Sequence, residues 1–304
     1  MATRPAPSSA DAGAGLGVGP GAAGDPDADA VATEPGSDLP RTGRVVEGRR
    51  KVRMADVGAD RRARLDALAR YLHDVAEDDA AGAALPATVG WVLRSTRMQI
   101  DRFPTLGEEL VLHTFCSATA TRWAERTSVV RGSGGALVRA VSIWVAVDTT
   151  TGAPVRLGDW FFSVYGPSAE GRRASARLAL GPPLGPAPPA RPWPLRRSDI
   201  DAWSHVNNAI AWAAVEDAVE IGPDDTMVAL LEHHAPIGAE ARPVLAVRSH
   251  GDERSVWLLD SGGDPGGTLR VLMASKVEPR PDPRAGGREA PPPGTTICPG
   301  EEEP

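Results

Sequence analysis

The chain contains few cysteines and no long apolar run. Its only cysteines among 304 residues are Cys116 and Cys298, too few for a disulfide framework and without the paired spacing of a zinc site. The longest apolar runs, such as residues 140–147 and 209–215, fall far short of the ~20 residues that a membrane-spanning helix requires. The N-terminus also lacks the compact apolar stretch of a secretory signal. The sequence therefore predicts a cytoplasmic protein without a membrane span.

Charge is distributed unevenly along the chain. The net charge of -7 comes from the two ends, because residues 1–43 carry -4 and residues 278–304 carry -3. Both ends are rich in proline and glycine, a composition that predicts disordered tails. Residues 44–277 hold equal numbers of basic and acidic residues, so the basic footprint of a nucleic-acid-binding domain is missing. We expect no nucleic-acid partner.

A proline-rich segment at residues 166–190 is predicted to be a linker between two domains, residues 44–165 and 191–277. In the first domain, apolar residues from Leu65 to Ala76 recur at helical spacing, and Asp60 is placed to cap that helix. Strand-like runs follow at 89–100, 109–119, 124–131 and 137–147.

The second domain repeats this order. A short run at 193–200 precedes a helix at about 205–220, and strands are then predicted at 227–234, 244–250, 256–260 and 269–277. Residues 209–215 are apolar on every side, so this helix should be buried within a curled sheet. Periodicity alone indicates an α+β fold. An antiparallel sheet wrapped around one helix, present twice, is the architecture of a tandem (double) hot-dog.

The densest polar cluster lies at the start of the second predicted helix. Asp201 and His205 occur there together with Ser204 and Asn207. A helix N-terminus has unpaired N–H groups and a partial positive charge, which stabilise an oxyanion. Asp201 is then a candidate base or nucleophile, and His205 a group that orients water or protonates the leaving group. The amides of Ser204 and His205 are the expected oxyanion donors, with Asn207 in a positioning role.

A simpler interpretation of the same residues is helix capping. Asp201 or Ser204 is a suitable N-cap, and Asn207 and Asn208 are suited to bind first-turn backbone groups. The residue types alone do not separate capping from catalysis.

Several spaced motifs resemble the acyl-acyl carrier protein (acyl-ACP) thioesterases of plants and bacteria. The second domain matches through Asp199, Asp201, His205, Asn208, Trp212 and Glu216. The first domain matches through Phe103, Pro104, Leu106, Gly107 and Glu108. The resemblance covers nearly all of residues 46–277. It implies hydrolysis of fatty acyl-ACP thioesters in fatty acid biosynthesis, with the acyl chain in the N-terminal hot-dog and catalysis in the C-terminal one.

The match to this family is incomplete at residues near the predicted catalytic site. Plant members have an asparagine where this chain has Trp203, and a glutamate-cysteine pair where it has Pro236 and Ile237. No cysteine nucleophile is therefore available there. An aspartate-centred mechanism remains, and it resembles that of the hydroxybenzoyl-CoA type of hot-dog thioesterase.

Other residues are candidates for substrate binding or docking. Trp91, Met98, Trp203 and His233 are expected to contact substrate. No metal or other cofactor is expected, because His233 and His234 point to opposite faces of a strand and lack convergent partners. Basic residues at 49–53 and 61–64 either dock an acidic carrier protein or form a solvated face.

Three alternatives to an acyl-ACP thioesterase stay open. An acyl-CoA thioesterase would use the same site with another carrier. A degenerate hot-dog would bind acyl thioesters without cleaving them, as Trp203, Pro236 and Ile237 suggest. A hot-dog hydratase is a weaker rival, although its aspartate-histidine spacing is close to that of Asp201 and His205. The partner is then acyl carrier protein or a CoA thioester, and the molecule a monomeric pseudo-dimer or a homodimer.

Overall fold

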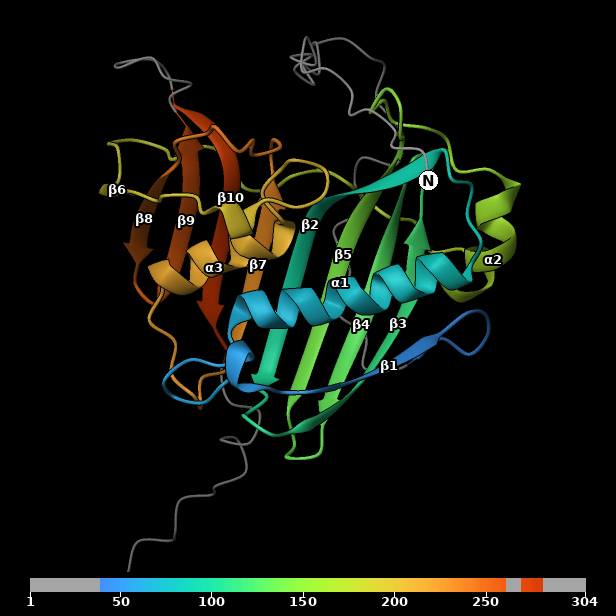
Figure 1. Ribbon diagram of the computed structural model, residues 1–304, viewed down its shortest axis with the longest axis horizontal. Helices are drawn as coiled ribbons and strands as arrows, with labels where there is room; N and C mark the ends of the chain where they lie inside the picture. Colours follow the sequence, from blue (N-terminus) through green and yellow to red (C-terminus); the bar gives the residue numbers. More distant parts are fainter. Residues whose placement is uncertain (1–38, 261–268, 281–304) are drawn as a thin grey trace, which may run out of the picture.

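The computed structural model describes residues 39–260 and 269–280. Of the predicted tails 1–43 and 278–304, only residues 39–43 and 278–280 are among those described. The rest of both tails, with Cys298, lies outside the described residues. The described chain forms one ten-stranded sheet in the order β1-β3-β4-β5-β2-β7-β10-β9-β8-β6, and every pairing in it is antiparallel. Helices α1 (Leu65–Gly82) and α3 (Asn208–Ala218) lie in line across one face of this sheet (Figure 1).

The strands of the two halves meet in the middle of the sheet. The first half contains β1 (Val46–Lys51), β2 (Val89–Arg102), β3 (Glu109–Thr119), β4 (Trp123–Gly132) and β5 (Leu137–Asp148). The second half contains β6 (Ala190–Pro192), β7 (Met227–His233), β8 (Val244–His250), β9 (Glu253–Asp260) and β10 (Arg270–Pro279). β2 pairs with β7 from Ser95 opposite Glu232 to Ile100 opposite Met227. The two hot-dogs therefore share one sheet, and the predicted α+β tandem hot-dog is confirmed.

The helix α3 is buried on most sides, as its composition predicted. Trp212, Ala214 and Val215 have no exposed surface, and they pack in the main core beside Leu68 of α1. Burying a large apolar side chain contributes about 1.5–3 kcal/mol. The core of the protein thus lies between the two helices and one face of the sheet.

A carboxylate of α3 caps the start of α1. The N-cap position of α1 is Arg64, which makes no side-chain capping bond, so the expectation that Asp60 caps this helix is wrong. Instead the Leu65 amide donates to Glu216 Oε2 at 2.9 Å, and Glu216 Oε1 lies 2.5 Å from Arg62 Nη2. Asp60 pairs with the same guanidinium, 2.9 Å from Arg62 Nε. Glu216 therefore connects the two helices electrostatically.

Some local boundaries differ from the predictions. Helix α2 (Asp159–Ala169) was not predicted, because Gly166 and Pro167 are unfavourable inside helices. Packing of Phe161 and Tyr165 in a second apolar cluster outweighs that preference, and the helix extends into the predicted linker. The strand expected at 193–200 is replaced by β6 and a 3-10 turn, η2 (Arg197–Asp199). A second such turn, η1 (Met54–Asp56), precedes α1.

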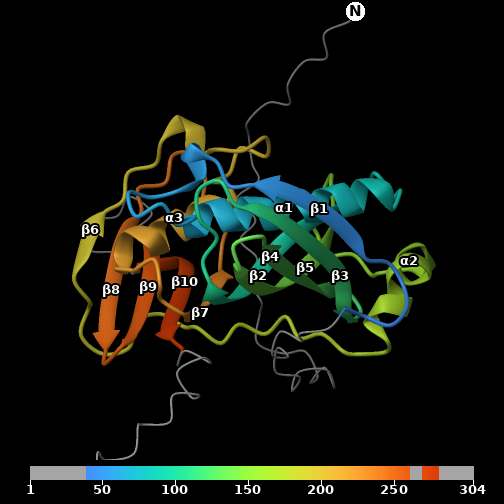
Figure 2. The same ribbon diagram turned by 90° about the horizontal axis from the view of Figure 1, so that it is seen from below.

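The proline-rich segment after α2 follows the opposite face of the sheet as a strap (Figure 2). The amides of Ala179 and Leu180 both donate to the buried Glu232 carboxylate at 2.8 Å. The indole of Trp123 donates to Ala174 O, and that of Trp257 donates to Gly181 O, both at 3.0 Å. Glu232 is therefore a structural anchor for the strap.

Replacement of Glu216 should destabilise the fold. We expect Glu216→Ala to lower the free energy of unfolding by about 3 kcal/mol, because it leaves the Arg62 guanidinium, only 7% exposed, with a weaker set of partners. Urea denaturation followed by circular dichroism measures the change. Glu240→Ala is the matched control, since Glu240 also pairs with an arginine but is 96% exposed, and it should show no measurable change. Equal effects of the two substitutions would contradict the role of Glu216.

Candidate functional site

Two cavities meet at the segment that precedes α3. The first, of about 450 Å³, is bounded by α1, α2 and the strands β2, β3, β4 and β5. The second, of about 410 Å³, lies between the ends of β2 and β5 and the chain after β7. Five residues border both cavities: Trp91, Asp201, Trp203, Asn207 and Asn208. A substrate that occupies both cavities must pass these residues.

Asp201 is held in place by its own turn. Its Oδ1 accepts hydrogen bonds from the amide of Trp203 at 2.8 Å and, more weakly, from that of His205 at 3.4 Å. The Asp201 amide donates to His205 O at 2.8 Å. Ser204 completes the turn with a φ of 63°, a left-handed conformation unusual for a residue with a side chain. The half-buried carboxylate is thus fixed at the junction of the cavities.

The structure corrects the predicted oxyanion donors. The Ser204 amide donates to Asp201 O at 3.0 Å, and the His205 amide donates to the Asp201 side chain. Both N–H groups are therefore engaged within the turn. The helix begins at Asn208, three residues beyond His205, so neither donor belongs to its first turn. The exposed His205 instead borders the second cavity.

Asn207 is the N-cap of α3. Its Oδ1 accepts from the Ala209 amide at 2.9 Å, and its carbonyl accepts from the Ile210 amide at 2.8 Å. Capping is therefore confirmed for Asn207, whereas neither Asp201 nor Ser204 is the N-cap. Asn208 is the first helical residue, and its amide donates no hydrogen bond within the described chain. This amide lies at the positive end of the helix, beside both cavities.

Two neutral histidines approach the junction from other elements. His73 of α1 borders the first cavity, and burial lowers its pKa to about 4. His233 of β7 borders the second cavity, and its pKa falls to about 3 because of burial and then the charges of His73, Arg94 and His234. The sequence indicated His233 but not His73, whose position on a polar edge of α1 gave no signal of the nearby cavity.

Comparison with known proteins identifies the family. Residues 43–165 match the N-terminal domain of acyl-ACP thioesterases. An uncharacterized protein of Mycobacterium tuberculosis is 30% identical over 219 residues, which cover 71% of this chain and 87% of the relative. The chain belongs to the acyl-ACP thioesterase family. Its members are thioester hydrolases.

Solved structures of the family share the fold. The 12:0-ACP thioesterase from Umbellularia californica superposes with a TM-score of 0.63 at 20% identity, covering 78% of this chain and 97% of that one. An acyl-ACP thioesterase from Bacteroides thetaiotaomicron gives a TM-score of 0.60 at 16% identity, covering 78% and 98%. The tandem hot-dog is therefore the architecture of this family as well as of this chain.

The predicted substrate contacts divide into two groups. Trp91, Trp203 and His233 border the cavities, and Trp203 is 69% exposed. Met98 does not, and its assignment to the substrate site is corrected. Its side chain is fully buried in the main core, because its place on β2, paired with Ala140 and Ala229, turns it beneath α1.

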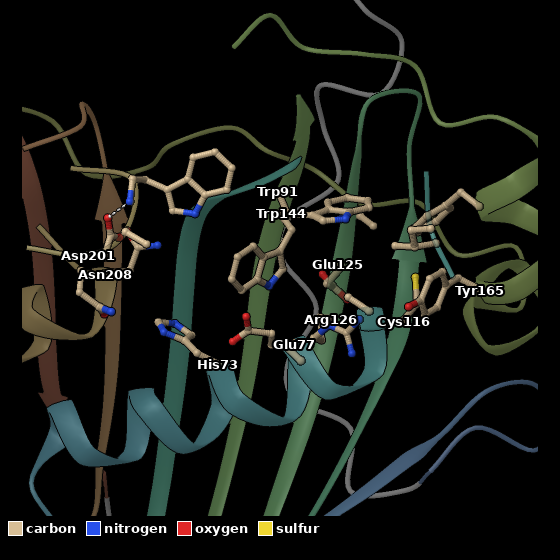
Figure 3. Close-up of a pocket in the computed structure, with 18 residues that line it drawn as sticks. His73, Glu77, Trp91, Cys116, Glu125, Arg126, Trp144, Tyr165, Asp201 and Asn208 are labelled. Atoms are coloured by element: carbon tan, nitrogen blue, oxygen red, sulfur yellow. Dashed lines mark hydrogen bonds between the residues drawn. The ribbon is translucent and has the colours of Figure 1, made fainter. Parts of the chain in front are cut away.

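The structure gives no support for a cysteine nucleophile in this protein. Cys116 borders the first cavity at the end opposite Asp201 (Figure 3). Burial raises the pKa of its thiol to about 12, so the thiol stays protonated at neutral pH. The aspartate-centred interpretation is the one that this geometry favours.

The basic cluster of residues 49–64 is largely neutralised by ion pairs within the chain. Arg49 pairs with Glu47, Arg50 with Asp74, Lys51 with Glu109, Arg62 with Asp60 and Glu216, and Arg64 with Asp66. This cluster therefore gives little support to electrostatic docking of a carrier protein.

The described residues include no group of three or more His, Cys, Asp or Glu side chains arranged to hold a metal ion. Nor is any helix between residues 39 and 260, or in 269–280, long and apolar enough to cross a bilayer.

The buried histidines should make stability depend on pH. Since their folded-state pKa values lie below the usual ~6.5, the unfolded chain binds protons first, and stability is lost as the pH falls from about 6.5 toward 4. We expect His73→Gln to flatten the fall in unfolding free energy between pH 7 and pH 5. Urea titrations across that range measure it. His250→Gln, at an exposed histidine, should leave the slope unchanged, and an unchanged slope in His73→Gln would refute the assignment.

Proposed function

We propose that this protein hydrolyses acyl-ACP thioesters to free fatty acids in the cytosol, with the thioester carbonyl held where the two cavities meet. The observation that carries this proposal is the position of Asp201. Its carboxylate borders both cavities at the start of α3, so a substrate that fills both presents its reacting bond to it. The family match to acyl-ACP thioesterases supports the choice of carrier.

The two cavities suit the two parts of such a substrate. The first leads away from Asp201 past Trp91 and Trp144 and accommodates the acyl group (Figure 3). The second leads toward His205 and the segment 234–237, and it accommodates the pantetheine arm of the carrier. Acyl carrier protein and CoA share this arm, so the same site serves an acyl-CoA substrate as well.

The proposed reaction begins with Asp201. As a base, it removes a proton from water while the water oxygen bonds to the carbonyl carbon, and the C–S bond then breaks as the thiolate takes up that proton. As a nucleophile, it would form an acyl-enzyme that water later hydrolyses. In both cases the carbonyl oxygen becomes negative. The Asn208 amide and the positive end of α3 are placed to stabilise it.

A second candidate function is binding of acyl thioesters without cleavage. Trp203 occupies the place of an asparagine in plant members and borders both cavities, while Pro236 and Ile237 replace their glutamate and cysteine. A thiolate is a good leaving group, so the proposed mechanism requires little help from the missing side chains. Hydrolysis is therefore the function that we favour.

Asp201→Asn should lower kcat by about 100-fold or more, since a positioned base contributes ~10²–10⁴ to the rate. The amide oxygen of asparagine can still accept the hydrogen bond from the Trp203 amide, so the turn and the fold should persist. Release of free thiol from acyl-ACP and acyl-CoA substrates with the same acyl chain measures the rate and compares the carriers.

Asp225→Asn is the control for this substitution. Asp225 is an exposed aspartate that also closes a turn, accepting the Gly222 amide at 2.7 Å. It should leave turnover unchanged. Full activity in Asp201→Asn would refute the proposed chemistry. Tight binding of acyl thioesters with no thiol released by the unmodified protein would establish the binding function instead.

A further inference from the structure

The second cavity is bordered by a single basic side chain. Among the described residues that line it, Arg94 of β2 is the only lysine or arginine. Arg94 does not border the first cavity, so it is not one of the residues at the junction. In the proposed function it therefore lies beside the carrier arm, rather than beside the acyl group or the thioester carbonyl.

An irregularity in β2 places Arg94 at this cavity. The register of β2 against β5 shifts between Leu93 and Ser95, so Arg94 is an extra residue in the strand, as in a β-bulge. The pairing of β2 with β7 begins only at Ser95. Arg94 thus lies just beyond the paired region, and its Nη1 donates to the carbonyl of His233, the last residue of β7, at 3.0 Å. This bond holds the guanidinium at the cavity.

Most of the guanidinium is available to a ligand. The side chain is half-buried, and the bond to His233 is the only hydrogen bond that it makes with residues 39–260 and 269–280. Neither its Nε nor its Nη2 is fully buried. No carboxylate within the described ranges forms an ion pair with it. A guanidinium has several N–H donors, and here one carbonyl oxygen uses only one of them.

The carboxylates around Arg94 favour a neutral ligand over an anion. Burial lowers the pKa of the Arg94 guanidinium, and the nearby charge of Glu232 acts in the opposite direction. Asp148 and Asp201 border the same cavity. All three carboxylates accept hydrogen bonds from main-chain N–H groups rather than from Arg94. An anion bound at Arg94 would be repelled by them, whereas an uncharged acceptor would gain the N–H groups without that cost.

The pantetheine arm contains acceptors of this kind. It is a flexible chain with amide groups, and each amide carbonyl loses hydrogen bonds to water when it enters the cavity. A hydrogen bond from a charged donor replaces that loss more effectively than one from a neutral donor. Arg94 is therefore suited to bind the arm through a carbonyl oxygen.

We propose that Arg94 binds an amide carbonyl of the pantetheine arm and makes the protein selective for thioesters that carry this arm over simple alkyl thioesters. This inference rests on the proposed function, because it assigns the second cavity to the arm. Arg94 does not contact the reacting atoms in this arrangement. We therefore expect it to affect KM rather than kcat.

Two thioesters of the same acyl group test the proposal: acyl-pantetheine and an S-ethyl thioester, which has no amide group. Arg94→Met removes the guanidinium and keeps an unbranched side chain. We expect it to raise KM for acyl-pantetheine about 10-fold with kcat unchanged, since a hydrogen bond from a charged donor contributes on this order. The kcat/KM for the S-ethyl thioester should not change. An equal loss for both thioesters would indicate a general structural effect and would overturn the proposal.

Arg254→Met is the matched control. Arg254 of β9 is also half-buried and donates from Nη1 to a main-chain carbonyl, that of Gly251, at 2.7 Å, but it borders neither cavity. This variant should retain the KM of the unmodified protein for both thioesters.

Acyl-CoA distinguishes the amides of the arm from its phosphate. It carries the same arm with phosphate groups added, so Arg94→Met should raise KM for acyl-CoA and acyl-pantetheine by the same factor. An increase for acyl-CoA alone would assign Arg94 to the phosphate and contradict the amide contact.

Binding to the Asp201→Asn variant separates this inference from the proposed function. The dissociation constant of acyl-pantetheine is measured for Asp201→Asn with and without Arg94→Met. If the unmodified protein hydrolyses no thioester but Arg94→Met weakens this binding about 10-fold, only the proposed hydrolysis fails. If hydrolysis depends on Asp201 and Arg94→Met leaves the binding unaltered, only the inference about Arg94 fails.

Discussion

The carboxylate of Glu216 joins two helices that otherwise belong to separate halves of the molecule. It accepts the first amide of α1 and pairs with Arg62, so the start of one helix is fixed to the last turns of the other. The pairing of β2 with β7 fixes the two halves of the sheet in the same way. Together these contacts determine where α1 lies over the first half of the sheet. The first cavity depends on that placement, because one of its walls is α1.

The proposed reacting centre is built by a turn rather than by a helix. The chain from Asp201 to His205 folds back on itself, and its amides bind the Asp201 side chain and backbone. A carboxylate held by main-chain N–H groups cannot rotate freely, so its orientation toward both cavities is set before substrate arrives. The helix α3 begins only after this turn. Its first amide is therefore left for a ligand, while the amides predicted for that task are already bonded.

Side chains on the two faces of the sheet have different roles. On the face that carries the helices, Asp201, His73 and Tyr165 border open space. On the other face, Glu232 binds the strap between the two halves. The buried carboxylate of Glu232, although it is near the candidate site, therefore has a structural role. The alternation of side chains along a strand explains why Glu232 and His233 have different roles.

The sequence by itself determined the elements whose signal is local. The strands β2 to β5 and β7 to β10 follow from alternating and apolar runs, and the buried helix follows from residues 209–215, because such patterns depend only on neighbours in the chain. The short edge strands β1 and β6 were not predicted. The capping role open to Asn207 is local for the same reason. Tertiary structure decided the remainder. Packing formed α2 despite Gly166 and Pro167, and Glu216 replaced Asp60 as the cap of α1. It also placed Met98 in the core and brought Tyr165, Arg126 and Asp79 together. These outcomes depend on contacts between residues far apart in sequence, and no pattern along the chain encodes which of them will meet.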